Sequence, residues 1–313
     1  MKTTPTFSIV MPVHNAASTL CASVQSVIKQ SLQDWELILI DDGSSDGSLQ
    51  LAKLIASADP RISSLGFANA GPSTARNRGL GLARGRYIAF LDADDLWHAD
   101  RLAGFAELFE QQENVGVLFS RTQFIRADGQ LLRTVTPHCP TLTLEKLLSE
   151  NPVCSTSNIA CRREVIKQIG MFEDGLDYAE DQDWLVRFAA AGAWSAMGVD
   201  KIWFYYRSTP DSQSGDLEAM RSGWTQLVNR AQDIAGAPIA AMRERAYAVF
   251  CRQLARRALR QPGAQSEAFR WFKESVRSDP KIFLREPRRT LLTALGVLVA
   301  HLPFSKAREL VSQ

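Results

Sequence analysis

The chain has 313 residues, 45% of them hydrophobic and 22% charged, which is typical of one large or two average-sized globular domains. No repeat of about 20–50 residues and no low-complexity segment occurs, so no repeat fold is expected. The net charge of +2 and the five scattered cysteines (Cys21, Cys139, Cys154, Cys161 and Cys251) indicate neither a nucleic-acid partner nor a zinc site or disulfide framework.

Three short apolar runs in the first hundred residues predict buried strands. These runs are Phe7–Val13, Trp35–Ile40 and Tyr87–Leu91. Apolar residues at helical spacing predict helices at 18–30 and at about 48–58 between them. Strands that alternate with helices at this spacing form βαβ units, so we predict an α/β fold with a mainly parallel sheet.

Polar residues follow each of these strands. They are His14–Asn15, Asp41–Asp42 and Asp92–Asp95. Because ligands bind beyond the carboxyl ends of the strands in such sheets, we expect the three groups to converge in space.

The acidic cluster is the most informative of the three groups. The carboxylates of Asp92, Asp94 and Asp95 would repel one another in a cleft of reduced dielectric, and a divalent cation relieves that repulsion. Oxygen ligands suit Mg²⁺ or Mn²⁺, which complete their coordination with substrate phosphates and water. The alternative is that these acids cap a helix over 96–109, although a cap needs only one acid.

Other charged segments each have two interpretations. Asp41-Asp42 forms a solvated turn or accepts hydrogen bonds from a nucleoside. The arginines of Gly71–Gly79 pair with the acidic cluster or face diphosphate oxygens. The acids at 180–183 open a helix, where the helix dipole favours them, or supply a general base.

The second half of the chain is expected to be mixed and then helical. Strands are predicted at 115–119, 124–125 and 202–206, and helices at 144–148, 163–169 and 181–191. After Gly215 the sequence is rich in Ala and Arg with few turn signals, which predicts a helical C-terminal region.

Five segments, taken in sequence order, resemble the family 2 glycosyltransferases, which have the GT-A fold. The segments are 8–15, 37–44, 75–77, 85–95 and 180–183, and Gly170–Phe172 and Tyr206–Arg207 also fit. The resemblance implies a Rossmann-like, mostly parallel sheet with helices on both faces, plus the helical C-terminal region. It divides the chain into a nucleotide-sugar-binding half (1–110), an acceptor-binding and catalytic-base half (111–215) and the helical region (216–313).

The resemblance also implies roles for the residues that match its motifs. The residues expected to bind the donor are Pro12, Val13, His14, Asn15, Asp41, Asp42, Arg76, Asp92, Ala93 and Asp94. Within the DxD element Asp94 is the expected chief metal ligand, and Asp92 is the second. Asp181 is similar to the family's catalytic base. The residues placed on the acceptor side are Glu180, Asp183 and Trp184.

The implied reaction moves a sugar from a nucleotide-diphosphate donor, above all a UDP-sugar, to a hydroxyl of a saccharide or lipid-linked saccharide. It inverts the anomeric centre, uses Mn²⁺ or Mg²⁺, and belongs to cell-surface polysaccharide or glycolipid synthesis, as a hexosyl- or N-acetylhexosaminyltransferase. A nucleotidyltransferase and a non-catalytic nucleotide-sugar-binding protein are the alternatives. The first would need a Gly-rich basic loop after the first strand, and residues 14–20 contain none.

Two positions depart from the family pattern. His14 stands where many relatives have a tyrosine. Thr209 stands where many have a histidine that is a possible metal ligand, whereas Ser212 and Ser214 keep the rest of that segment. Either metal binding then rests on carboxylates and diphosphate alone, or this loop closes differently from that of the relatives.

The C-terminal region raises the question of a membrane. Residues 216–313 hold 17 Lys and Arg against 9 Asp and Glu, which suits an anionic surface or, alternatively, ordinary solvated arginines. Residues 291–300 are apolar but too short to span a bilayer. We expect a core helix there, with an interfacial helix anchored by Arg288 and Arg289 as the alternative. The absence of a signal pattern and the free cysteines predict a cytoplasmic location, with peripheral membrane contact as an option.

Overall fold

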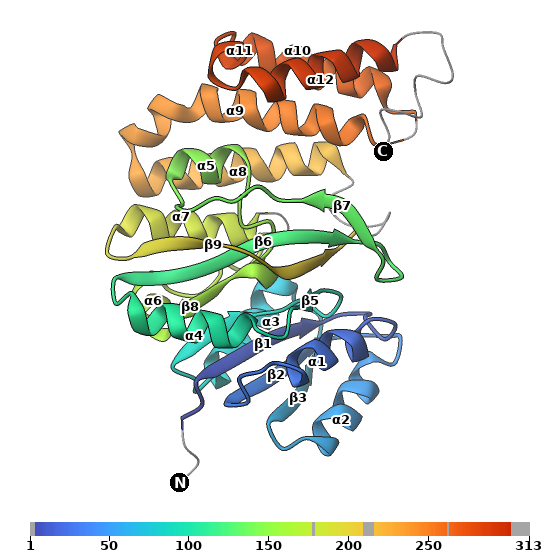
Figure 1. Cartoon of the computed structure of the whole chain (residues 1–313), viewed down its shortest axis with the longest axis vertical. Coiled ribbons are helices and arrows are strands. Elements are labelled where there is room, and N and C mark those ends of the chain that lie inside the picture. Colours follow the sequence, from blue (N-terminus) through green and yellow to red (C-terminus); the bar gives the residue numbers. More distant parts are fainter. Residues whose placement is uncertain (1–3, 177–178, 209–215, 262, 302–313) are drawn as a thin grey trace. The chain divides into compact units, whose positions relative to one another are not determined.

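The computed structural model describes residues 4–176, 179–208, 216–261 and 263–301 (Figure 1). Contacts between residues divide the chain into two units. The first comprises Met1–Leu142 and Pro152–Pro210, and the second comprises Thr143–Asn151 and Asp211–Gln313. The segment 143–151 therefore belongs with the C-terminal helices, although it lies within the sequence of the first unit. The expected features of Thr209, Ser212 and Ser214 lie outside the described residues.

The first unit is built on one nine-stranded sheet in the order β3-β2-β1-β4-β8-β6-β9-β5, and β7 pairs with β6. The strands are β1 (Phe7–Val13), β2 (Trp35–Asp42), β3 (Ile62–Phe67), β4 (Tyr87–Phe90), β5 (Leu96–Trp97), β6 (Val115–Ile125), β7 (Leu131–Val135), β8 (Ala160–Arg162) and β9 (Ser195–Arg207). Pairing is parallel from β3 through β4 and between β6 and β9. β8 pairs antiparallel with both β4 and β6, so the expected parallel arrangement holds for the first half of the sheet.

Helices cover both faces of this sheet, as expected. Those of the first unit are α1 (Leu20–Ile28), α2 (Ser48–Ala58), α3 (Pro72–Leu82), α4 (Arg101–Gln111), α6 (Arg163–Ile169) and α7 (Glu180–Ala191), with a 3₁₀ turn at Thr156–Asn158. Alternate residues of β1 point to opposite faces. Phe7 and Ile9 join a core with residues of α1 and α4, whereas Val10 meets α3 at Gly79 on the other face.

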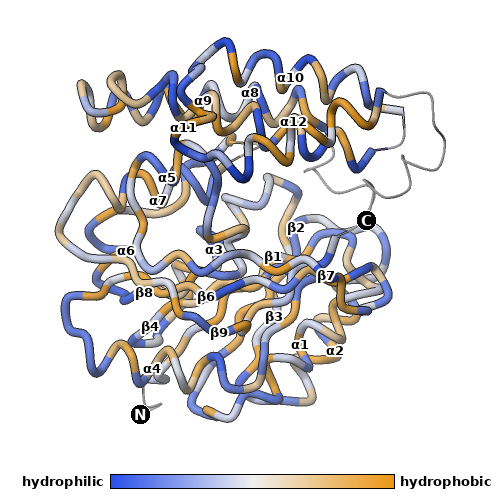
Figure 2. Tube along the Cα trace, turned by 45° about the horizontal axis from the view of Figure 1, so that its top comes forward, coloured by the Kyte–Doolittle hydropathy of each residue, from blue (hydrophilic) through white to orange (hydrophobic). Residues whose placement is uncertain are grey.

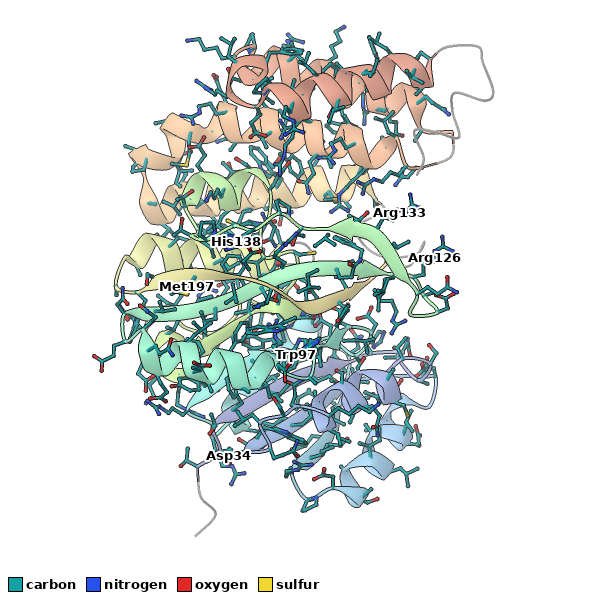
Figure 3. The ribbon with its side chains drawn as sticks, viewed as in Figure 1. Asp34, Trp97, Arg126, Arg133, His138 and Met197 are labelled. Carbon is teal, nitrogen blue, oxygen red and sulfur yellow. The ribbon has the colours of Figure 1, made fainter. Side chains whose placement is uncertain are left out.

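The segment after the acidic cluster corrects one alternative interpretation. Leu96–Trp97 form the short strand β5, which pairs with β9, and α4 begins only at Arg101. The acids at 92–95 therefore lie too far before the helix to cap it. Trp97, labelled in Figure 3, is buried, and its indole N–H donates to Ser157 O at 2.9 Å.

The second unit is helical in all of its described elements. They are α5 (Leu144–Ser149), α8 (Leu217–Ala235), α9 (Ala237–Ala258), α10 (Gln265–Ser278), α11 (Ile282–Arg285) and α12 (Pro287–Ala300). The expected helical C-terminal region is thus confirmed. Among the described residues, no helix combines the length and apolarity needed to cross a bilayer.

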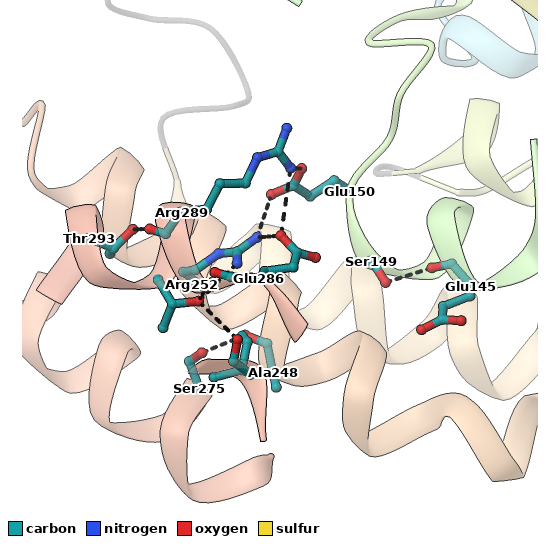
Figure 4. A network of polar contacts seen from close by, with 11 residues as sticks. Glu145, Ser149, Glu150, Ala248, Arg252, Ser275, Glu286, Arg289 and Thr293 are labelled. Atoms are coloured by element: carbon teal, nitrogen blue, oxygen red, sulfur yellow. Dashed lines mark hydrogen bonds and ion pairs between the residues drawn. The ribbon is translucent and has the colours of Figure 1, made fainter. Parts of the chain in front are cut away.

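A buried ion-pair network holds α5 within the second unit (Figure 4). Arg252 of α9 is fully buried and donates to Glu150 Oε1 at 3.3 Å and to Glu286 Oε2 at 2.7 Å. Arg289 of α12 donates to Glu150 Oε2 at 2.8 Å. Because the buried guanidinium needs these carboxylates, Glu150 is joined to α9 and α12.

Candidate active site

The three polar strand ends do converge at one edge of the sheet. β1 lies between β2 and β4, and all three run parallel. Val13 is paired with Asp41, and Val10 is paired with Phe90, two residues before Asp92. The register therefore brings the ends of these strands to one level.

The two aspartates at the end of β2 have different surroundings. Both are buried. The carboxylate of Asp42 accepts hydrogen bonds from Ala70 N at 3.0 Å and Gly71 N at 2.8 Å, and it pairs with Arg78 at 3.3 Å. Asp41 Oδ2 accepts from Ser44 N at 3.1 Å, whereas its buried Oδ1 has no hydrogen-bond partner among the described residues. Asp42 thus fixes the segment before α3, and Asp41 keeps one unused acceptor.

Hydrogen bonds join the loop after β1 to the loop after β2. Asn15 adopts a left-handed conformation (φ 48°), which asparagine tolerates better than most residues. Its N–H donates to Ser44 Oγ at 3.0 Å, and its side-chain oxygen accepts from Ser45 N at 2.9 Å. His14 is exposed, with Nδ1 2.9 Å from Asp42 O, and Val13 is buried. The loops expected to hold the nucleoside are therefore joined before any ligand arrives.

Arg76 connects the DxD element to the Glu180-Asp181 pair. Its side chain is buried, and its two terminal nitrogens donate to Asp92 Oδ1 at 2.7 Å and to Glu180 Oε1 at 2.8 Å. Burial disfavours the charged form, but the two carboxylates outweigh it, so the pKa of Arg76 is raised and the guanidinium stays charged. Of the two sequence interpretations, the structure shows pairing with the acidic cluster.

The three acids of the cluster differ in what they contact. Asp95 is buried and accepts from Arg207 N at 2.9 Å, so it fixes the loop to β9. Asp92 pairs with Arg76. Asp94 is exposed, and no side chain among the described residues pairs with its carboxylate. Although part of the residue reaches the surface, protein surrounds its carboxyl group, and the resulting loss of hydration, followed by repulsion from Asp92, raises the pKa of Asp94 to about 6.

This arrangement fits a cation held mainly by Asp94. An unpaired carboxylate whose pKa is raised by loss of hydration and by a second acid is stabilised by a nearby positive charge. No group of three or more His, Cys, Asp or Glu side chains within the described residues is arranged to hold a metal ion by itself. A cation here would therefore need oxygens from its substrate, as Mg²⁺ and Mn²⁺ accept.

Arg207 was not assigned a role from the sequence, although it belongs to the Tyr206-Arg207 pair of the resemblance. The residue is buried, and its Nε donates to Asp94 O at 2.6 Å. Its Nη1 donates to Ala127 O at 2.6 Å, in the turn between β6 and β7. Arg207 thus holds the backbone of the DxD loop from the side of β9.

Asn77 of α3 also holds a backbone segment in place through hydrogen bonds. Its side-chain amide donates to Phe172 O at 2.9 Å, and its side-chain oxygen accepts from Phe172 N at 3.0 Å. This two-way bond explains why an asparagine follows Arg76. It fixes the 170–174 segment that leads toward α7.

Two expected acceptor-side residues lie inside the protein, which corrects that assignment. Trp184 is fully buried and donates to Gly170 O at 3.0 Å. Asp183 is 1% exposed and pairs with Arg187 at 3.0 Å. Both therefore support α7 rather than face an acceptor. Asp181 and Glu180 remain partly exposed in the first turn of that helix.

The fold and the relatives agree on the class of protein. The structure of TarS from S. aureus superimposes with a TM-score of 0.60 at 16% identity, covering 98% of this chain and 90% of that chain. This likeness confirms the expected GT-A fold.

The profile described as "Glycosyl transferase family 2" matches residues 8–170, just over half of the chain. The chain therefore belongs to glycosyl transferase family 2. Among its relatives, the putative teichuronic acid biosynthesis glycosyltransferase TuaG of Bacillus subtilis is 28% identical over 65% of this chain and 88% of TuaG. The glucosyltransferase WfgD of Escherichia coli is 37% identical over 45% of this chain, and the match spans about half of WfgD (54%).

Proposed function

We propose that this protein transfers a hexosyl or N-acetylhexosaminyl residue from a nucleoside-diphosphate sugar to a hydroxyl of a saccharide or lipid-linked saccharide, with inversion. The observation that carries the proposal is the Arg76 bridge. One guanidinium binds both Asp92, in the element assigned to the donor diphosphate, and Glu180, beside the assigned base. This bridge supports the proposal, because one buried side chain links the element assigned to the donor with the helix that carries the assigned base.

The donor half rests on Asp94 and on the loops after β1 and β2. Asp94, with Asp92 as second ligand, would hold Mn²⁺ or Mg²⁺, which supplies Lewis-acid neutralisation of the charge on the leaving diphosphate. Asp41 retains an unused buried acceptor at the end of β2, beside the loops assigned to the nucleoside. Such an oxygen accepts a hydrogen bond from a base N–H or a ribose hydroxyl.

The acceptor half rests on Asp181. Its carboxylate takes the proton of the acceptor hydroxyl as that oxygen bonds to the anomeric carbon. The bond from the anomeric carbon to the diphosphate oxygen breaks at the same time, and the diphosphate leaves with that electron pair. Attack opposite the leaving group inverts the anomeric centre.

The substrate class is inferred from named relatives. WfgD is named for transfer of glucose from UDP-Glc to a GlcNAc-diphosphoundecaprenol with a β-1,3 linkage, and TarS was solved with UDP-GlcNAc. Both names support a UDP-sugar donor, and the first supports a lipid-linked acceptor and a β-linked product. We infer a reaction on the cytoplasmic side in cell-surface polysaccharide or glycolipid synthesis, since the free cysteines suit a reducing compartment.

The proposal is tested by measuring UDP release from a panel of UDP-sugars with Mn²⁺, Mg²⁺ or EDTA. Asp181→Asn should lower kcat by about 10²–10⁴-fold with little change in donor affinity, since only proton transfer is removed. Asp94→Ala should weaken Mn²⁺ binding, measured calorimetrically, together with turnover. Asp233→Asn, an exposed acid of α8, is the matched control and should leave both quantities unchanged.

Different results would reject different parts of the proposal. Full turnover by Asp181→Asn would remove Asp181 from the base role. Unchanged Mn²⁺ affinity in Asp94→Ala would remove the metal assignment. Binding of UDP-sugars without turnover on any saccharide acceptor would favour a non-catalytic binding protein.

A further inference from the structure

The last described helix exposes its most apolar residues. Leu291, Leu292, Leu295 and Leu298 of α12 are 58%, 67%, 58% and 64% exposed. Leu291, Leu295 and Leu298 stand at i, i+4 and i+7 and so share one face, with Leu292 beside them. Figure 2 shows hydrophobic colour along much of the trace of α12. The expectation of a core helix is therefore wrong for this face.

Packing on the opposite face fixes this orientation. Thr290, Thr293, Val297 and Ala300 are buried. Thr290 Oγ1 accepts a hydrogen bond from the buried Arg252 at 3.2 Å, and α12 packs against α9, α10 and α11. Turning the helix to cover its leucines would expose this bonded face, so the leucines stay outward in the second unit.

The charges carried by α12 itself are positive. From Pro287 to Ala300 the helix carries two arginines and no acid. Arg288 is exposed on the leucine side of the helix, and Lys281 is exposed just before α11. No described carboxylate pairs with either of them. An apolar stripe with unpaired cations at one end suits a surface that is apolar inside and anionic outside.

We propose that the leucine face of α12 (Leu291, Leu292, Leu295 and Leu298) binds the surface of an anionic bilayer. The leucines enter the boundary between headgroups and acyl chains, and Arg288 and Lys281 lie against lipid phosphates. A second copy of the chain is a poorer occupant. A stable dimer buries roughly 800 Å² on each partner, from about 20–30 residues, and this stripe has four leucines.

This inference deepens the proposed function by naming the surface where a lipid-linked acceptor would be met. Vesicle binding requires no turnover, so its failure and that of the transferase are observed separately. The full chain is sedimented with phosphatidylcholine vesicles, with or without phosphatidylglycerol. Wild-type protein should bind the anionic vesicles, and binding should weaken with added salt.

The test variant is Leu292→Gln/Leu295→Gln. Because both side chains are exposed, the fold should be kept, which circular dichroism checks. The vesicle partition coefficient should fall by about a hundredfold, since each leucine leaving water contributes roughly a factor of ten. Leu54→Gln in α2, also 67% exposed, is the matched control and should bind as wild type does. Arg288→Gln should weaken binding to anionic vesicles only.

Three results would overturn the inference. The first is wild-type protein that remains in the supernatant with every vesicle, as it would if another segment of the chain covered the face. The second is equal binding by the double leucine variant and Leu54→Gln. The third is a wild-type dimer, detected by light scattering, that the double variant converts to monomer, which would make a second copy the occupant.

Discussion

At the scale of single residues, the site depends on arginines that hold carboxylates in place. Arg76 is buried and joins Asp92 to Glu180, and Arg207 holds the backbone of Asp94. The sequence predicted that charged residues would gather here, because strand ends share an edge. It could not separate Asp183, which is buried, from Asp181, which is partly exposed, because both lie in one helical turn.

Replacing Arg76 tests its role as a bridge. Lysine is a point charge and does not reach two carboxylates with the planar fork of arginine. Arg76→Lys should lower the free energy of unfolding by about 1.5–3 kcal/mol, because lysine keeps the charge but one of the two carboxylates loses its charge-assisted hydrogen bond. Turnover should fall by more than the remaining folded fraction explains, because Glu180 and Asp92 lose their common partner.

Urea unfolding and UDP release measure the two effects. Arg78→Lys is the control on the same helix, because Arg78 is partly exposed and has one carboxylate contact at 3.3 Å. If Arg76→Lys kept wild-type turnover per folded molecule, the bridge would be structural only.

At the scale of elements, the sequence patterns predicted the strands that are long apolar runs, including the partly buried part of β9 at 202–206, but not the short buried strand β8. β1, β2 and β4 are continuous apolar runs and were predicted. β3 was missed, because only Ile62 of its six residues is buried and the rest is polar or exposed. α3 was missed as well, since its sequence has two glycines and little apolar periodicity. Both elements owe their structure to the strands and helices they pack against rather than to local pattern.

The two glycines of α3 allow a matched test of that packing. A Cβ on Gly79 would lie 2.4 Å from Val10 Cγ1, whereas a Cβ on Gly81 would meet nothing within 4 Å. Gly79→Ala should therefore destabilise the protein by about 1–3 kcal/mol through overpacking. Gly81→Ala should stabilise it by roughly 0.5–1 kcal/mol, because alanine favours the helix.

Thermal or urea unfolding of the two variants gives the answer directly. Equal stabilities would mean that α3 moves away from β1 at little cost. In that case Arg76, on the same helix, would also be held less firmly than the structure indicates.

At the scale of the whole molecule, the division of the chain was the hardest feature to predict. A boundary after Gly215 follows from composition, but the structure assigns Thr143–Asn151 to the second unit as well. α5 is a short helix, and its sequence contains no pattern that indicates which helices it packs against. Its place depends on Trp224 and Arg252, which donate to Leu148 O and Glu150. Such long-range contacts are not encoded in a local pattern.

Because α5 belongs to the second unit, we predict that a fragment without the C-terminal helices exposes apolar surface and self-associates. Leu147 and Leu148 of α5 are fully buried, and Trp224 Nε1 donates to Leu148 O at 2.6 Å. A fragment ending at Ser208 would lose the helices that cover both leucines, at a cost of roughly 1.5–3 kcal/mol for each. We expect it to bind a hydrophobic dye and to self-associate in light scattering. The same fragment carrying Leu147→Lys/Leu148→Lys should show neither property, and a monomeric, dye-free unsubstituted fragment would place α5 with the first unit instead.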